Sequence, residues 1–357
     1  MTREQHDRPD RDQTLNGLAQ EFERFARQEC GESPLYQRLA GAIARDPDLL
    51  RLAAHGDHGP KPNLLLGAVH YVLMADARDP LAAFYPSVSV APAPITDPVP
   101  AFRAFCLLYA KQIQELMQTR RVQTNEVARC AILLPGFALV AQRAAAPSLQ
   151  LVEVGASAGL LLHWERYGYD YGDAWHVGRD REVVIPCEVR GTARPPFPDR
   201  LPSVRSRIGI DLHPIDLEDA DQARWLQALV WPDQPERAGR LGRAVAVARQ
   251  QPAPLIAGDA TVVLPGLLSA LPMAGELCLF HAHTLNQFAP DDRRRYVELL
   301  AEHSRRRSLY DLSLEYVSGD HPQMELRRFR DGAIVEQRTL ARYDAHGRWV
   351  EWNPSAI

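Results

Sequence analysis

The segment LVEVGASAGLLLHW, residues 151–164, carries the clearest chemical pattern in the chain. Its centre, from Gly155 to Gly159, can be interpreted in two ways. As G-x-S-x-G it is a nucleophile elbow, in which Ser157 attacks an ester. As E-x-G-x-x-x-G after an apolar strand it is a nucleotide-binding turn, whose glycines allow tight turning and close backbone approach to a ligand.

The sequence supports the hydrolase interpretation only in part. It requires the order serine, acid, histidine, and Ser157, Asp259 and His283 satisfy that order. No HGGG-type oxyanion segment appears upstream, where the pattern predicts helices. We therefore favour the nucleotide turn and expect the Ser157 hydroxyl to cap the helix that follows. A serine hydrolase stays as the alternative.

The nucleotide turn predicts further acids at neighbouring strand ends. Glu153 stands two residues before the first glycine and can meet the amino-acid end of a ligand. The next strand, SRIGID, ends in Asp211, whose carboxylate suits two ribose hydroxyls. A third strand, PLIAGD, places Asp259 and Ala260 near a base. These residues and the turn form the expected cofactor site.

A fourth strand-like run, ELCLFHAH, supplies candidates for chemistry. His281 and His283 share one face if the run is extended. Either imidazole can take a proton from a hydroxyl or amine acceptor, although a packed histidine pair is an equal alternative. Asn286 orients the acceptor or caps a turn. A metal is not expected, because no third ligand lies nearby in the sequence.

Two other segments offer acceptor contacts. In QTNEVARC, Asn125, Glu126 and Arg129 reach into the cleft, or the segment simply opens a helix with Thr124 as its N-cap. In HWERYGYDYGD, Tyr167 lines an acceptor pocket or packs the top of a helix. Both alternatives stay open for both segments.

The elements that position these residues fall into two halves. The pattern of the first half predicts helices. From about residue 149, strand-like runs alternate with helices, which predicts a parallel sheet with helices on both faces. The tail predicts antiparallel strands with Asp331-Gly332 as a hairpin turn. We expect an α-helical cap region over residues 1–147 and an α/β domain over residues 148–357, with an insertion near residues 172–205.

Composition narrows the classes of function. The 357 residues are 46% hydrophobic with a net charge of -4, which does not favour a nucleic-acid-binding scaffold. The five cysteines form no C-x-x-C pair, so neither a disulfide framework nor a zinc site is expected, and a reducing cytoplasm fits. The charged N-terminus is no signal peptide, and no apolar run is long enough to span a membrane.

The motifs VEVGASAGL, GIDLHP and GDAT, in this order, resemble those of class I S-adenosylmethionine-dependent methyltransferases. The resemblance implies a Rossmann-like fold with a mostly parallel seven-stranded sheet and an antiparallel C-terminal hairpin. It also implies S-adenosylmethionine as cofactor and a small-molecule acceptor. The chain departs from the family at Ser157, which replaces the middle glycine, and in the long gap to Asp211. If that gap holds the second strand, Glu188 becomes the ribose acid; we prefer Asp211.

The whole chain also resembles an uncharacterised bacterial family, domain of unknown function 2332. The segments that carry this resemblance are NLLLGAVHYVLM, FYPS, QTNEVARC, VEVGASAGL and WPDQPERAGRL. It implies that the helical half and the sheet half belong together, but it transfers no activity. A non-catalytic protein that retains the ligand turn is therefore a third interpretation.

Overall fold

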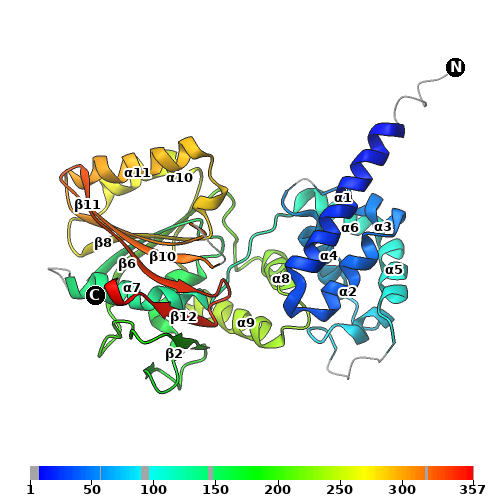
Figure 1. Cartoon of the computed structure of the whole chain (residues 1–357), viewed down its shortest axis with the longest axis horizontal. Coiled ribbons are helices and arrows are strands. Elements are labelled where there is room, and N and C mark those ends of the chain that lie inside the picture. The colour runs from blue at the N-terminus through cyan, green and yellow to red at the C-terminus, as the bar shows by residue number, and fades with distance from the viewer. Residues whose placement is uncertain (1–7, 57, 90–95, 144–147, 318–320, 357) are drawn as a thin grey trace. The chain divides into compact units, whose positions relative to one another are not determined.

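The structure is a computed structural model that describes residues 8–56, 58–89, 96–143, 148–317 and 321–356. The chain forms two compact units (Figure 1). One comprises Met1–Thr124 and Asp219–Gly242, and the other comprises Asn125–Glu218 and Arg243–Ile357. The domain boundary expected at residue 147 stays a prediction, because these units are defined by packing and each draws on two stretches of chain.

The first unit is helical. Helix α4 is buried along most of its length, because NLLLGAVHYVL is apolar on all sides. Two helices begin at a proline that follows a capping side chain: Ser33 accepts from Tyr36 N before α2, and Asp46 accepts from Asp48 N before α3. The elements before residue 124 are α1 (Arg8–Gln28), η1 (Cys30–Glu32), α2 (Pro34–Ile43), α3 (Pro47–Ala53), α4 (Lys61–Leu73), η2 (Pro80–Phe84), α5 (Val99–Leu108) and α6 (Ala110–Thr119).

A later segment completes this helical unit. Helix α8 (Ala220–Ala228) contributes Trp225, which is 4% exposed and donates from Nε1 to the carbonyl of Arg121 over 2.8 Å. The Trp225 ring also lies 5.9 Å from that of Tyr71 on α4. The segment therefore supplies part of the core of the first unit. Helix α9 (Pro235–Gln250) follows and begins at a proline, a residue favoured in the first turn of a helix.

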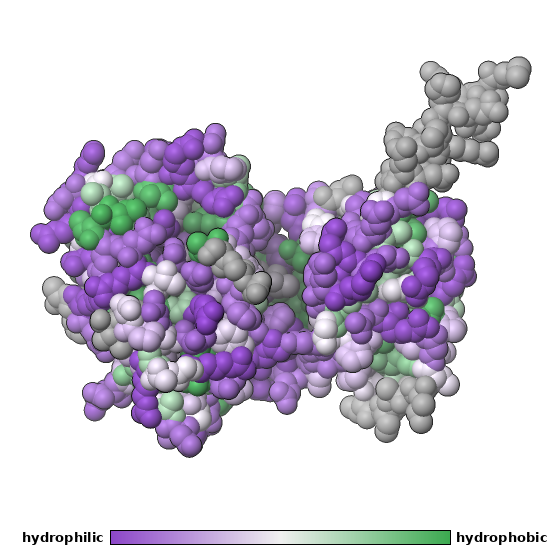
Figure 2. Space-filling model, in the orientation of Figure 1, coloured by the Kyte–Doolittle hydropathy of each residue, from purple (hydrophilic) through white to green (hydrophobic). Residues whose placement is uncertain are grey.

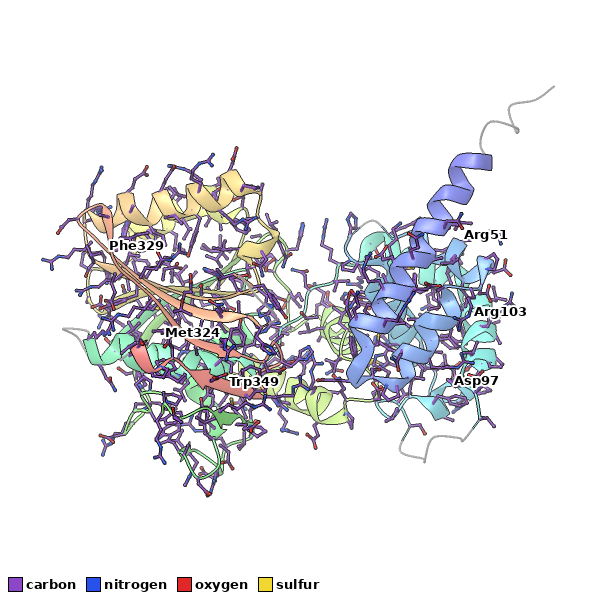
Figure 3. All side chains as sticks on the ribbon, in the orientation of Figure 1. Arg51, Asp97, Arg103, Met324, Phe329 and Trp349 are labelled. Carbon is purple, nitrogen blue, oxygen red and sulfur yellow. The ribbon has the colours of Figure 1, made fainter. Side chains whose placement is uncertain are left out.

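Ion pairs join neighbouring helices at the surface of the helical unit. Arg103 on α5, which is labelled in Figure 3, pairs with Asp46 and Asp48 at the start of α3, over 2.7 and 2.6 Å. Figure 2 shows mostly hydrophilic residues on the visible face of each unit. Among the helices in the described ranges, none is long and apolar enough to cross a membrane.

The second unit is built on a nine-stranded sheet with the order β5-β12-β11-β10-β9-β8-β1-β6-β7. The neighbours β7, β6, β1, β8 and β9 pair in parallel, and the neighbours β9, β10, β11 and β12 pair antiparallel. The strands are β1 (Ser148–Val154), β5 (Glu188–Arg190), β6 (Ser203–Asp211), β7 (Leu255–Ala257), β8 (Glu276–Ala282), β9 (Leu309–Glu315), β10 (Gln323–Arg330), β11 (Ala333–Tyr343) and β12 (Trp349–Trp352).

This topology confirms a mixed α/β fold with a large, mostly parallel sheet. The expected number of seven strands was wrong, because β12 and β5 extend the edge beyond the C-terminal hairpin. The hairpin turn at Asp331-Gly332 is confirmed: both residues have positive φ, 53° and 87°, as a tight two-residue turn requires. Met324 and Phe329 on β10 are fully buried in this unit (Figure 3).

Helices cover both faces of the sheet. Helix α7 (Arg129–Arg143) lies on one face, and α10 (Ala260–Ala270) and α11 (Pro290–Ser304) lie on the other (Figure 1). Gly136 lets α7 approach β9, since a Cβ at this position would lie 2.7 Å from Leu312 Cδ2. β1 is buried on both sides along most of its length, which is typical of a central parallel strand.

The expected insertion near residues 172–205 forms structure of its own. It provides β3 (His176–Val177) and β4 (Val184–Pro186), which flank β2 (Gly168–Asp170) in a small three-stranded sheet. It also provides β5, which pairs with β12 at the edge of the large sheet.

The strand order places a switch point beside β1. From β1 the chain continues to β6 and then β7 on one side, whereas β8 and β9 lie on the other side. Ligands of open α/β sheets bind where the strand order reverses, at the carboxyl ends of the strands. The turn after β1 lies at this point.

Candidate ligand-binding site

The turn after β1 has an alternating left-handed backbone. Gly155, Ser157 and Gly159 have φ values of 77°, 51° and 70°. Glycine adopts such values freely, whereas a serine there is strained. The position taken by Ser157 therefore has the conformation that a middle glycine would adopt. The backbone amides of Gly155 and Ala156 both donate to Ile210 O, over 2.8 and 3.1 Å, and fix the turn against β6.

Asp211 holds the middle of the turn. Its Oδ2 accepts from Ser157 N and its Oδ1 from His213 N, each over 2.8 Å. Glu188, the alternative acid, lies on β5 at the opposite edge of the sheet. Of these two acids, only Asp211 adjoins the turn.

Asn125 braces the turn from the chain before α7. Its Nδ2 donates to Ala156 O over 3.1 Å, and its Oδ1 accepts from Leu160 N over 3.0 Å. The expected cap by Ser157 is wrong: its buried Oγ has no hydrogen-bond partner among the described residues. The helix that follows is a short 3-10 helix, η3 (Leu160–Arg166), without a side-chain cap from its own N-cap residue.

Glu153 is a buried carboxyl beside this turn. The residue is 1% exposed, and its Oε2 has no hydrogen-bond partner among the described residues. Burial raises the pKa of Glu153 well above its ordinary value; the nearby Asp211 adds to this shift and Arg129 opposes it. Glu153 thus offers a buried carboxyl oxygen without a hydrogen-bond partner among the described residues, which suits a hydrogen-bond donor supplied by a ligand.

The loop after β8 packs against the turn through Thr284. A Cβ on Gly155 would lie only 2.2 Å from Thr284 Oγ1, so the glycine is required for this approach. Sequence reasoning missed Thr284, because nothing in its local pattern links it to a turn more than a hundred residues earlier.

His281 contacts Glu315, the side chain that holds the same loop. It is 1% exposed, its Nδ1 lies 2.7 Å from Glu315 Oε1, and its Nε2 lies 3.6 Å from Asp311 Oδ1. The same Glu315 oxygen accepts from the backbone amides of Thr284 and Leu285. His281 therefore acts within a buried polar network that orders the β8 loop.

His283 is the more accessible of the two histidines. Its φ is 57°, and its Nε2 lies 3.0 Å from the Tyr343 hydroxyl. Burial lowers the pKa of His283 to about 3, with the Arg129 guanidinium adding to the shift, so its imidazole is neutral. Its ring meets that of Tyr316 edge-on, with centroids 5.3 Å apart. A strained, neutral histidine at the end of β8 is a candidate for contact with a substrate.

Most of the chain matches one protein family. Residues 19–352 match the family described as uncharacterized protein conserved in bacteria (DUF2332). The chain belongs to the DUF2332 family. No curated protein and no solved structure matches it. The family match includes most of both compact units, so the helical and the sheet unit belong to one DUF2332 chain.

The remaining predicted residues of this DUF2332 protein are spread around the turn. Arg129 is buried and donates from Nε to Ala345 O over 3.0 Å, and Glu126 accepts from Ala128 N over 3.1 Å. Because Arg129 shifts the pKa values of both Glu153 and His283, it lies near both. The helix expected from Thr124 begins instead at Arg129.

Four other predicted residues have structural roles within the protein itself. The buried Tyr167 hydroxyl donates to Leu160 O over 2.8 Å. Asp259 caps α10 by accepting from Thr261 N, and Ala260 is buried in the first turn of that helix. Asn286 is exposed and donates its backbone amide to Glu315 Oε2 over 3.3 Å. These contacts account for the four residues without a ligand.

The serine, acid and histidine of a hydrolase are not joined in the described part of this DUF2332 chain. Asp259 binds Thr261, His283 contacts Tyr343, and Ser157 Oγ lacks a partner. In the same residues no cluster of three histidine, cysteine, aspartate or glutamate side chains can hold a metal ion. All five cysteines are buried free thiols.

Proposed function

We propose that this DUF2332 protein binds S-adenosylmethionine at the carboxyl ends of β1, β6 and β7 and transfers its methyl group to a small-molecule acceptor. The observation that carries the proposal is the turn itself. Three alternate residues with positive φ follow the central strand at the point where strand order reverses, and an acid ends the neighbouring strand. This agrees with the motif resemblance to class I methyltransferases.

The polar groups around the turn suit such a cofactor. The unused Oε2 of Glu153 is a buried acceptor for the ammonium of the amino-acid end. The Asp211 carboxylate lies at the carboxyl end of β6 and binds the amide of the turn residue Ser157, and a carboxylate at this place suits ribose hydroxyls. Buried polar atoms without partners call for an explanation, and a polar ligand provides one.

Exposed apolar side chains at the same strand ends suit a base. Leu212 follows Asp211 and is 62% exposed, and Val262 in the first turn of α10 is 76% exposed. A flat ring that lay over both side chains would remove their apolar surface from water, which favours binding. We therefore expect the base end of the cofactor to lie beside β6 and β7.

The bound cofactor supplies a methyl group activated by a sulfonium. The protein contributes mainly proximity and orientation of the acceptor. We assign His283 to the acceptor side, because it is neutral and its loop adjoins Gly155 through Thr284. An imidazole with so low a pKa is a weak base, so His283 orients a hydroxyl or amine more than it removes its proton. His281 positions the loop.

Calorimetric titration with S-adenosylhomocysteine tests the proposal. We expect micromolar binding to the wild-type chain and at least a tenfold loss in Val262→Asp, which puts a carboxylate where the base packs. An acid in the first turn of α10 is compatible with the helix, so this variant should fold. Val335→Asp, at another exposed valine on β11, is the matched control and should bind like wild type.

Two outcomes would overturn the proposal. One is the absence of binding to protein shown to be folded. The other is a covalent adduct of a fluorophosphonate probe on Ser157, which would support the serine hydrolase instead.

A further inference from the structure

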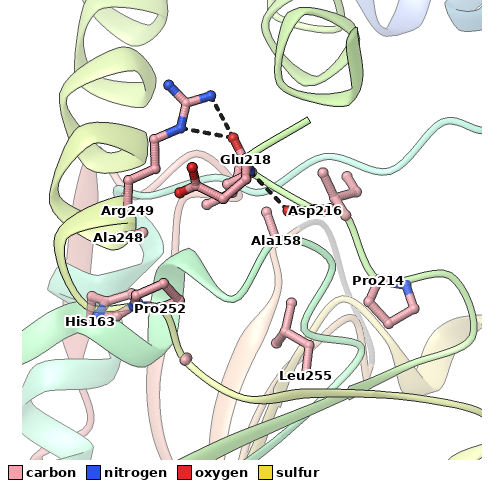
Figure 4. A pocket seen from close by; sticks show the side chains of 12 residues that line it. Ala158, His163, Pro214, Asp216, Glu218, Ala248, Arg249, Pro252 and Leu255 are labelled. Carbon is pink, nitrogen blue, oxygen red and sulfur yellow. Dashed lines mark hydrogen bonds between the residues drawn. The ribbon is translucent and has the colours of Figure 1, made fainter. Parts of the chain in front are cut away.

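A crevice of about 300 Å³ lies beside the turn, between η3, the loop after β6 and the chain that joins α9 to β7 (Figure 4). Ligand sites in proteins start at about this volume. All of its lining residues belong to the second unit. Its walls are mostly apolar and include Ala158, Pro214, Ile215, Leu217, Ala253 and Leu255. Ala158 also belongs to the Gly155–Gly159 turn, so the crevice and the turn share a wall.

His163 is the buried polar residue of this crevice. It is 1% exposed, and its Nδ1 lies 3.2 Å from Arg207 Nη1. Arginine can only donate, so Nδ1 accepts and the hydrogen of the neutral ring resides on Nε2. Arg207 is itself held by Glu165 over 2.6 Å and by Leu162 O over 3.1 Å. The tautomer of His163 is therefore fixed by its neighbours.

The Nε2–H of His163 is available to a ligand. It has no hydrogen-bond partner among the described residues, and the residue lines the crevice. Burial, with Arg207 adding, lowers the pKa of His163 to about 4, so the ring stays neutral at physiological pH. A neutral ring offers one hydrogen bond but no charge to an occupant.

The mouth of the crevice is polar. Asp216 and Glu218 carry carboxylates there, and the Arg249 guanidinium is turned to the Leu217 carbonyl, with Nε and Nη2 at 2.8 and 2.5 Å (Figure 4). The two carboxylates disfavour an anion at the mouth, and the apolar walls disfavour a cation further in.

We infer that this crevice is a second small-molecule site, for a compact uncharged ligand with an apolar body and one acceptor atom that receives the His163 Nε2 hydrogen. The crevice adjoins the carboxyl-end site at Ala158 but is lined by other residues than those assigned to the cofactor, and the inference does not depend on that cofactor. Apolar walls with one placed polar group are typical of sites that bind such molecules.

Three probes of similar size test the inference by ligand-observed NMR. Acetophenone has a ring and an acceptor, ethylbenzene lacks the acceptor, and benzoate adds a negative charge. We expect acetophenone to bind about fivefold more tightly than ethylbenzene, the usual net effect of one hydrogen bond. Benzoate should bind more weakly than acetophenone.

Variants locate the binding. Ala253→Leu fills the crevice and should abolish acetophenone binding, whereas Ala270→Leu, at an exposed alanine on α10, should not. His163→Phe should make acetophenone and ethylbenzene bind equally. If that variant fails to fold, the probe series and Ala253→Leu still decide. Equal binding of all three probes, no binding to folded protein, or unchanged binding in Ala253→Leu would each overturn the inference.

Discussion

At the scale of single residues, Ser157 combines strain with a role in the turn. Its φ of 51° costs a non-glycine residue about 1–2 kcal/mol. A glycine would relieve this strain, but it loses about 0.5–1 kcal/mol more chain entropy on folding, which offsets part of the gain. We expect Ser157→Gly to raise the free energy of unfolding by about 0.5 kcal/mol. Urea denaturation measures the change.

Two further variants at this position complete the test. Ser157→Ala removes only the hydroxyl and should leave stability nearly unchanged, because the Oγ has no partner among the described residues. Ser157→Val, which is β-branched, should destabilise the chain. A loss of stability in Ser157→Gly would show that the hydroxyl, rather than the backbone, governs this position.

Glu153 makes stability depend on pH. An acid whose pKa is raised by folding binds its proton more tightly in the folded state, so the unfolding free energy falls as pH rises. The fall begins near the ordinary value of 4.5 and continues up to the raised pKa, with a slope of at most about 1.4 kcal/mol per pH unit.

Glu153→Gln keeps the shape and removes this titration. We expect the variant to match wild type at pH 4 and to be more stable at pH 8, as measured by urea unfolding at the two pH values. Equal stability of the two proteins at pH 8 would contradict a raised pKa of Glu153 in the folded state.

The sequence indicated several of these residues but not their contacts. Glu153 and Asp211 were predicted from their places at strand ends, and both adjoin the turn. Hydrogen bonds between Asp211 and the Ser157 amide, or the approach of Thr284 to Gly155, depend on strand register and loop packing. Neither is encoded in a local pattern.

At the scale of elements, Asn125 joins the segment before α7 to the turn between β1 and η3. Asn125→Ala leaves the buried Leu160 amide without its acceptor and should destabilise the chain by about 1–3 kcal/mol. Asn125→Asp is the matched control: it keeps an acceptor for Leu160 N but loses the donor to Ala156 O. We expect Asn125→Asp to be destabilised less, by urea denaturation. Equal losses of stability in the two variants would contradict the role given to the Asn125 side chain in holding the turn.

The alternation of strand and helix predicted most elements of the sheet unit. The tight turn at Asp331-Gly332 was also predictable, because few residue types adopt positive φ at two consecutive positions. The 3-10 helix η3 was not, since periodicity does not distinguish it from a short α-helix. The pairing of β5 with β12 was not either, because it joins segments about 160 residues apart.

At the scale of the whole molecule, residues 219–242 pack with the N-terminal helices although they follow β6 in sequence. Trp225→Ala should therefore destabilise the helical unit, by about 3–5 kcal/mol for a buried tryptophan. Hydrogen exchange followed by mass spectrometry should show lost protection in α4 and α6 and retained protection in β1 and β8. Loss of protection confined to the sheet unit would contradict this division of the chain.

The function proposed for this protein depends on a cofactor binding at the turn between β1 and η3. Hydrogen exchange with and without saturating S-adenosylhomocysteine tests it most directly, because it reports both binding and place. We expect slower exchange in peptides that contain residues 153–159 and 209–213, with exchange in α1 to α6 unchanged. Unchanged exchange throughout, or protection only away from these two segments, would contradict binding at this turn.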